Sequence, residues 1–287
     1  MVKLRHSRAA LHKPSLSTIQ TLIFILFVTF TIFILILLTL RIPKFNHLNA
    51  ISRNALRSED QDDDNKSWVE IISWEPRAFF YHHFLTIEEC EHLINIAKPN
   101  MGKSLVVQSD KNGTVQNVYS RVRTSTGTFL LRGQDKIVRN IEKRIADFTF
   151  IPVEHGEDLQ ILHYEVGQEY VPHHDYFTDE YNLWNGGNRI ATMLMYLSDV
   201  EEGGETVFPA AKVNFSSVPW WNELSDCGKK GLSIKPKMGD AILFWGMKPN
   251  GTLDPSSMHG SCPVIKGDKW SATKWLHMGE VKTFSFS

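Results

Sequence analysis

Two residues close together in the chain, His173 and Asp175, are of the types that hold a transition metal. Alternate residues of an extended strand share a face, so these two would point the same way and His174 the opposite way. Two imidazole nitrogens and one carboxylate on one side of a metal form the facial triad of non-haem Fe(II) oxygenases, which leaves positions open for reactants. His259, which a short hairpin separates from Lys269, is the candidate third ligand. The pair alone is weak evidence, because a chain with 12 histidines can hold a His-x-Asp on a surface strand by chance.

The last predicted strand, over residues 270–277, is polar where a plain core strand would be apolar. One face of this strand and its preceding residue would present Lys269, Ser271, Thr273, Trp275 and His277, and the other face Trp270, Ala272, Lys274 and Leu276. The first face suits a polar pocket. A buried lysine is costly unless it meets an anion, and a dicarboxylate cosubstrate would supply one. The alternative is a lysine at a hairpin edge, in water.

Length, charge and cysteine content limit the classes of protein to which this chain can belong. The chain has 287 residues, a net charge of −1, and is 42% hydrophobic and 11% aromatic. This length allows one membrane anchor and one domain of ordinary to large size. The balanced charge indicates no polyanionic partner, and thus no nucleic acid. Three cysteines are too few for a disulfide scaffold.

The N-terminal region is predicted to anchor the chain in a membrane. Residues 1–18 are basic and polar, as a cytosolic tail would be, and residues 19–40 are an uncharged apolar run that matches a bilayer span of roughly 20 residues. A cleaved signal peptide would have an apolar core of only about 7–15 residues and a small-residue cleavage site. The alternative is a buried core helix. Residues 41–67, which include an acidic run, are expected to form a flexible lumenal stalk before a catalytic domain over 68–287.

Four glycosylation sequons favour a body in the secretory lumen. They begin at Asn65, Asn112, Asn214 and Asn250. Lysine and arginine flank both sides of the apolar run, so the positive-inside rule hardly discriminates between orientations. The economical topology is a single-pass type II protein of the endoplasmic reticulum membrane with a lumenal catalytic domain, and the Golgi is the alternative residence.

The pattern predicts helices first and strands afterwards. A strand over 69–74 opens the domain. Thr86, with glutamate three residues later, is typical of a capping box, and Pro99 ends that helix. A second helix, with apolar residues at helical spacing, begins near Gln134 and closes at Pro152.

After the second helix the pattern changes to short strands with glycine-containing turns. They are expected over residues 159–164, 171–176, 190–197, 231–234, 241–245, 263–265 and 270–277. This order predicts an α+β fold, with a double-stranded β-helix (jelly-roll) core over about 156–280 and flanking N-terminal helices.

Several sequence segments together carry a resemblance to a known family. They are Arg-Thr-Ser-Thr-Gly-Thr at 123–128, Leu-His-Tyr-Glu-Val-Gly-Gln at 162–168, Pro-His-His-Asp-Tyr-Phe at 172–177, the run 189–206, Lys-Met-Gly-Asp-Ala at 237–241, His-Gly-Ser-Cys-Pro-Val at 259–264 and Lys-Trp-Ser-Ala-Thr-Lys-Trp at 269–275. In this order they resemble the membrane-anchored prolyl 4-hydroxylases of plants, which are similar to the catalytic domain of collagen prolyl hydroxylase. The resemblance covers roughly residues 68–280.

The resemblance implies a reaction and its cofactors. The triad proposed above would hold Fe(II), Lys269 would pair with the distal carboxylate of 2-oxoglutarate, and Tyr164 and Thr192 would add hydroxyl contacts. O2 would hydroxylate peptidyl proline to trans-4-hydroxyproline while 2-oxoglutarate becomes succinate and CO2. L-Ascorbate would rescue oxidised iron. No acid or base from the protein is obligatory beyond the iron centre.

The resemblance also implies a groove for an extended polyproline II peptide, whose carbonyl groups are unpaired. The residues implied are Arg123, Ser125, Glu157, Tyr170, Arg189, Trp275 and His277. The arginines could instead be surface charges, and Trp275 a core residue. Proline-rich secretory and cell-wall chains are the implied substrates, and assembly with itself or with related hydroxylases is left open.

The cysteines and the function each leave alternatives. Cys227 and Cys262 would form a disulfide, as in similar enzymes, and the alternative is a reduced buried pair. Cys90 lies on the apolar face of the first helix and fits a free core cysteine. The alternatives to the hydroxylase are a non-catalytic module that binds proline-rich peptides and a 2-oxoglutarate dioxygenase that acts on another residue, such as lysine.

Overall fold

The computed structural model describes residues 20, 25–31, 67–104, 106–109, 115–118, 122–214 and 220–282. The chain divides into two compact units, Met1–Asp63 and Asp64–Ser287. In the first unit residues 25–31 are helical. None of the helices in these described ranges has both the length and the apolar character needed to span a bilayer. Most of the predicted anchor, the stalk, Asn65 and Asn112 lie outside the described residues.

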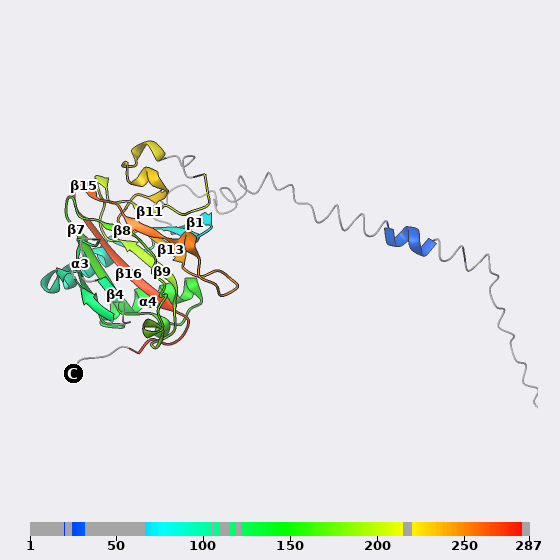
Figure 1. The fold of residues 1–287 in the computed structure, drawn as a ribbon, viewed down its shortest axis with the longest axis horizontal. Coiled ribbons are helices and arrows are strands. Elements are labelled where there is room, and N and C mark those ends of the chain that lie inside the picture. The colour runs from blue at the N-terminus through cyan, green and yellow to red at the C-terminus, as the bar shows by residue number, and fades with distance from the viewer. Residues whose placement is uncertain are drawn as a thin grey trace, which may run out of the picture. The chain divides into compact units, whose positions relative to one another are not determined.

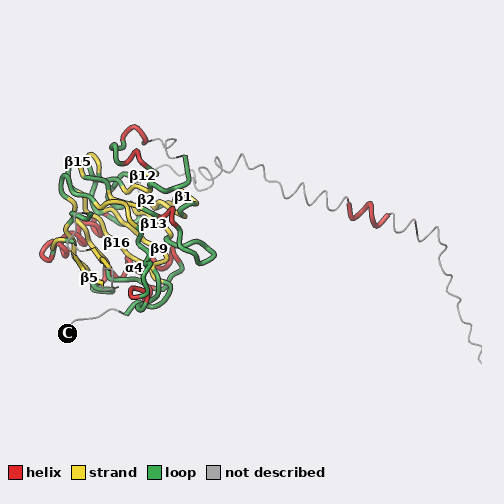
Figure 2. The backbone as a smooth tube through the Cα atoms, in the orientation of Figure 1, coloured by secondary structure: helices red, strands yellow, loops and turns green. Residues whose placement is uncertain are grey.

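The second unit is built on a large antiparallel sheet (Figures 1 and 2). Its strands, in spatial order, are β1 (Trp68–Trp74), β2 (Arg77–His82), β13 (Ala241–Trp245), β9 (Arg189–Tyr196), β16 (Lys269–His277), β7 (Leu159–Tyr164), β6 (Thr126–Leu130) and β3 (Gly102–Lys103). β16 lies between β9 and β7, and all nine of its residues are buried. The strand predicted to face a pocket is therefore central in the sheet.

A second sheet has the order β12 (Leu232–Ile234), β11 (Thr206–Phe208), β14 (His259–Ser261) and β8 (Tyr170–His173). Two further pairs are β10 (Glu202–Gly203) with β15 (Val264–Lys266), and β4 (Val106–Ser109) with β5 (Val115–Val118). Apolar side chains fill the space between the two main sheets: Ala78, Phe80, Tyr196, Phe208, Leu232, Ile234, Ile242 and Phe244. This core brings β8 and β14 opposite β9 and β16.

Two helices cover the other face of the large sheet, α3 (Ile87–Ala97) and α4 (Lys136–Thr149). The predicted capping box is confirmed, because Thr86 and Glu89 exchange side-chain and backbone hydrogen bonds. α4 begins at Lys136, two residues after the predicted start near Gln134, since Asp135 is its N-cap and accepts the N–H of Val138 at 2.8 Å. It ends at Thr149, and its C-cap Phe150 is in the left-handed conformation.

Most predicted strands are present, some with different bounds, and several observed strands were not predicted. The segments 159–164 and 241–245 form strands with the predicted bounds. The prediction of a strand over 171–176 is wrong at its end, because β8 stops at His173 and Asp175 follows it outside the strand. Sequence patterning missed β2, β6, β11 and β14. β2 is too uniformly apolar and aromatic to alternate, and β14 is a His-Gly-Ser with no apolar period.

Candidate active site

The three predicted metal ligands meet between the sheets. His173 ends β8 and His259 begins β14, and these residues are paired directly across the antiparallel ladder. Asp175 completes the group. Its Oδ1 lies 3.6 Å from Nε2 of His173, and its Oδ2 lies 3.5 Å from Nε2 of His259. One ligand atom from each residue lies within 4.8 Å of the others. Such convergence fits a facial triad.

Backbone carbonyls fix the orientation of both imidazoles. Nδ1 of His173 lies 2.9 Å from the carbonyl oxygen of Val171, and Nδ1 of His259 lies 3.0 Å from that of Ser257. A carbonyl only accepts, so each Nδ1 carries the proton and each Nε2 keeps a lone pair toward Asp175. Burial lowers the pKa of His259 to about 4, which keeps this ring neutral at pH 7. The donor set is thus ready for a divalent cation.

Asp175 is held as a carboxylate. Burial alone would raise its pKa, but His259, His173 and the Arg189 guanidinium together hold the pKa well below the usual range for aspartate. The hydroxyl of Thr192 also donates to Oδ2 of Asp175 at 2.7 Å. Thr192 lines the same cavity, so this bond adds a role beside the contact with the cosubstrate that was predicted for it.

His174 lies outside the triad. Its ring stacks on Tyr176 with centroids 4.5 Å apart, and its Nε2 is 3.2 Å from the carbonyl oxygen of Pro255. The separation from His173 was predicted, but the reason given, strand alternation through Asp175, does not hold. Other histidines that were predicted not to be ligands face carboxylates instead: His82 faces Glu70 and Asp240, His92 faces Asp135, and His163 faces Asp268.

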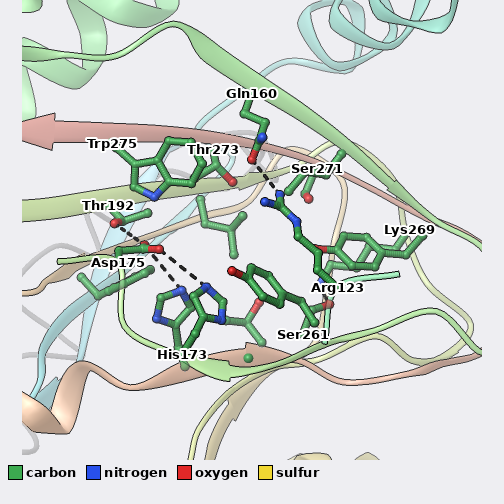
Figure 3. A pocket seen from close by; sticks show the side chains of 18 residues that line it. Arg123, Gln160, His173, Asp175, Thr192, Ser261, Lys269, Ser271, Thr273 and Trp275 are labelled. Carbon is green, nitrogen blue, oxygen red and sulfur yellow. Dashed lines mark hydrogen bonds and ion pairs between the residues drawn. The ribbon is translucent and has the colours of Figure 1, made fainter. Parts of the chain in front are cut away.

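Lys269 lies across the cavity from the triad, as Figure 3 shows. It is 1% exposed, and its Nζ donates to the carbonyl oxygen of Gly204 at 2.7 Å and to Oγ of Ser261 at 2.8 Å. Within the described part of the chain no carboxylate forms an ion pair with it. Burial lowers the pKa of Lys269 to about 7. Placing a carboxylate beside this ammonium would compensate its burial, so the site fits an anionic ligand.

The cavity collects most of the predicted residues. Arg123, Tyr164, Tyr170, His173, Asp175, Thr192, His259, Lys269 and Trp275 all line it. Gln160 and Ser261, which the sequence did not predict as site residues, line it too, as do Ser271 and Thr273 from the polar face of β16. Ser261 has the sequence signal of sharing the face of His259 two residues earlier. Gln160 had none, and its role becomes visible only in its 2.7 Å bond with Nη2 of Arg123.

Two buried donors in the cavity wall lack partners. Nε of Arg123 and Nε1 of Trp275 make no hydrogen bond to any described residue, although neither is reached by solvent. Such orphaned N–H groups are rare in proteins. Arg123 also stacks over Tyr170, whose ring in turn stacks on His173 at 3.6 Å. Free donors beside an aromatic wall suit a ligand that carries carbonyl or carboxylate oxygens.

Glu157, Arg189 and His277 form a linked cluster beside the cavity, and none of them lines it. Glu157 accepts bonds from Arg189 Nε at 2.5 Å and from His277 Nε2 at 2.6 Å. Burial would raise the pKa of Glu157, but Arg189 and His277 lower it to about 2. The guanidinium stacks on Trp275 at 3.9 Å and reaches the carbonyl oxygen of Asp175 at 3.5 Å. The cluster therefore connects the cavity wall to the triad.

The predicted serine, the cysteines and the glycosylation positions within the described residues are not part of the cavity lining. Ser125 is fully buried, and its hydroxyl pairs with that of Ser104 at 2.9 Å rather than facing the cavity. Cys227 and Cys262 form a disulfide, with Cα atoms 5.8 Å apart, and Cys90 is a free buried cysteine. The sequon residues Asn214 and Asn250 are exposed.

Comparison with known proteins agrees with this geometry. Residues 159–277 match the family model of the 2OG-Fe(II) oxygenase superfamily. The chain is 63% identical to probable prolyl 4-hydroxylase 10 of Arabidopsis thaliana, over 98% of this chain and 99% of that protein. It belongs to the prolyl 4-hydroxylase family. Prolyl 4-hydroxylase 5 of the same plant is 64% identical over 82% of this chain and 79% of its own.

A solved structure extends the likeness to the fold. The viral collagen prolyl hydroxylase of Paramecium Bursaria Chlorella virus-1, described as a 2OG complex, aligns with a TM-score of 0.50 and 27% identity. The alignment covers 71% of this chain and 97% of the viral one. The mixed α/β architecture with a mostly antiparallel sheet is thus that of 2OG oxygenases.

Proposed function

We propose that this member of the prolyl 4-hydroxylase family hydroxylates C4 of peptidyl proline to trans-4-hydroxyproline. The overall reaction uses one O2, places one oxygen atom on proline and the other in succinate, and releases CO2 from 2-oxoglutarate. The observation that carries the proposal is the pairing, in one cavity, of the His173, Asp175 and His259 triad with the buried, uncompensated Lys269.

The triad would hold Fe(II), which supplies O2 activation when bound. Neutral Nε2 atoms and one carboxylate oxygen suit that cation, and three positions stay free for reactants. Thr192 orients Asp175, while the Val171 and Ser257 carbonyls orient the imidazoles. Such supporting contacts fix the ligands before the metal arrives. L-Ascorbate is proposed as the reductant that restores oxidised iron.

The Lys269 end of the cavity would bind 2-oxoglutarate. Its ammonium would pair with the distal carboxylate. Ser261, whose hydroxyl accepts a hydrogen bond from Nζ, would help to orient that ammonium. Tyr164 pairs with Lys269 across β7 and β16, and its ring lies 5.4 Å from Nζ. The phenol would donate to the same carboxylate. A keto-diacid held this way would have its oxo acid end toward the triad.

The peptide would lie along the wall made by Arg123, Tyr170 and Trp275. After a small shift of these side chains, the unpaired Nε and Nε1 donors would meet peptide carbonyls, which are unpaired in a polyproline II chain. Glu157, Arg189 and His277 would flank this wall, and Ser125 would support it from behind. Proline-rich secretory and cell-wall chains are the proposed substrates. A binding module would need neither the triad nor Lys269, which makes catalysis the better interpretation.

The finer architecture and the setting are also part of the proposal. The two sheets with an apolar core between them support a double-stranded β-helix over about residues 156–280 within a catalytic domain over 68–287. Residues 1–18, 19–40 and 41–67 are proposed as cytosolic tail, signal anchor and lumenal stalk of a type II protein of the endoplasmic reticulum, with glycans on sequons and self- or hetero-assembly. The 22-residue apolar run and the disulfide support this setting.

Turnover tests the proposal. The domain over residues 68–287 would be incubated with Fe(II), 2-oxoglutarate, ascorbate and a polyproline peptide, and succinate and the peptide mass would be measured. The proposal expects succinate and a mass gain of one oxygen on proline. Hydroxylation of a lysine peptide only, or tight peptide binding with no succinate, would replace it with one of the two alternatives.

A further inference from the structure

A buried ion pair joins α4 to β16 behind the active-site face of the large sheet. Nζ of Lys274 lies 2.5 Å from Oε1 of Glu142, and these residues are 1% and 2% exposed. The other carboxylate oxygen of Glu142 accepts the N–H of Gly133 at 2.9 Å. A buried pair of this kind is weak evidence for stability, because packed apolar residues often replace one without loss.

The lysine lies directly under the segment that carries Glu157. A Cβ on Gly156 would stand 2.5 Å from Cε of Lys274, so any larger residue there would displace the end of the lysine chain or the segment itself. Gly156 is bridged to Leu276, and the N–H of Glu157 donates to the carbonyl oxygen of Trp275 at 3.0 Å. The backbone of Gly156 and Glu157 thus rests on β16 at the position of the ion pair.

Arg132 gives this segment a second support. Nη1 of Arg132 donates to the carbonyl oxygens of Glu154 at 2.9 Å and Gly156 at 3.1 Å. Its backbone N–H is bound by Asp158 at 2.8 Å. The residues before and after Glu157 are therefore held by Arg132 as well as by β16.

Glu157 transmits its position to the cavity. Its carboxylate binds both Arg189 and His277, and Arg189 stacks on Trp275. A displacement of its backbone would move two side chains of the proposed peptide groove together. The contacts of Lys269 with Gly204 and Ser261 involve none of these residues.

We propose that Glu142 and Lys274 are positioning residues for the peptide side of the site. The ion pair keeps Gly156 and Glu157 at a fixed distance from β16, and so sets where Arg189 and His277 meet a peptide. This inference rests on the proposed function. It predicts different effects on the two substrates: the ion pair affects the binding of the peptide and leaves the binding of 2-oxoglutarate unchanged.

The test replaces the pair by apolar residues of similar volume, Glu142→Leu with Lys274→Met, so that no charge is left buried alone. KM for a polyproline peptide is expected to rise about tenfold, while KM for 2-oxoglutarate stays within about twofold of wild type. A matched control is Arg144→Met, which removes another ion pair of α4, at 2.7 Å from Glu89; the hydrogen bonds of Arg144 go to Glu89 and Phe84. This control is expected to lower Tm without changing the ratio of the two KM values.

An unchanged peptide KM, or equal rises of both KM values, would overturn the positioning role. A second variant covers the case in which the core change prevents folding. Gly156→Ala pushes the segment off Lys274 and off the Val153 carbonyl oxygen, 3.2 Å from the new methyl group, and is also expected to raise the peptide KM selectively. An unchanged KM there counts equally against the role. Wild-type turnover is measured in parallel, so a failure of the proposed function is seen separately.

Discussion

Lys269→Met is expected to have opposite effects on stability and on cosubstrate binding. Methionine has similar length and volume but no charge, so the cavity keeps its shape. In wild type the ammonium is buried with only Gly204 and Ser261 as partners, and its pKa falls from 10.5 to about 7. That difference corresponds to about 5 kcal/mol against folding when the group is charged.

Removing the charge is therefore expected to stabilise the protein without 2-oxoglutarate. Lost hydrogen bonds to Gly204 and Ser261 offset part of the gain, which leaves about 1–3 kcal/mol, or roughly 3–10 °C in Tm. The sign with pH follows from the lowered pKa. The cost of the wild-type lysine is complete below pH 7 and fades as pH rises toward 10.5. The variant's advantage should be larger at about pH 6.5 than at about pH 9.5, by differential scanning calorimetry.

The same change is expected to damage cosubstrate binding. A carboxylate brought into this cavity would meet no opposite charge, and loss of one partner from a buried pair costs about 3–5 kcal/mol. The Kd for 2-oxoglutarate by isothermal titration calorimetry with Co(II) in place of iron should rise about 100-fold or more. Metal binding should stay near wild type, because Lys269 touches none of the triad. A variant that is less stable than wild type at both pH values, or that binds 2-oxoglutarate normally, would refute the reasoning.

Three further changes test the supports of the site. Thr192→Val removes the 2.7 Å bond to Asp175 and is expected to weaken Co(II) binding about tenfold, with unchanged affinity counting against this role. Asp254 accepts hydrogen bonds from Ser256 and so shapes the turn whose Ser257 carbonyl orients His259. Asp254→Ala should therefore weaken Co(II) binding about tenfold. Asp254→Asn keeps an acceptor oxygen and should leave Co(II) binding unchanged. Because its pKa is lowered to about 2, ionised Glu157 adds stability above pH 4.5 that is lost as the pH falls toward 2. In urea unfolding between these pH values, Glu157→Gln should lose less stability than wild type. The same pH profile in both proteins would contradict this contribution of Glu157.

Residue types and spacing were enough to find the reacting parts. His173 and Asp175 were brought together by closeness in sequence, and the pairing of His259 with His173 across β14 and β8 supplied the rest. The alternation along β16 correctly predicted which side faces the cavity. That argument worked because a central strand, buried on both faces, keeps its period of two.

Long-range contacts explain what patterning could not supply. β14 has no apolar period, so its existence depends on the strands that flank it. Asp175 reaches the triad from beyond the end of β8, through bonds with Thr192 and the imidazoles rather than through strand geometry. Lys274 looked like one more polar residue of β16, and its partner Glu142 lies 132 residues earlier on α4. No local signal connects two positions so far apart.

The position of bound iron tests the central claim most directly. Crystals of the domain grown with Fe(II) without oxygen would be measured on both sides of the iron absorption edge. The structure predicts one anomalous peak within bonding distance of Nε2 of His173, Nε2 of His259 and a carboxylate oxygen of Asp175. A peak at any other residues, or none at this site with Fe(II) present, would contradict the account.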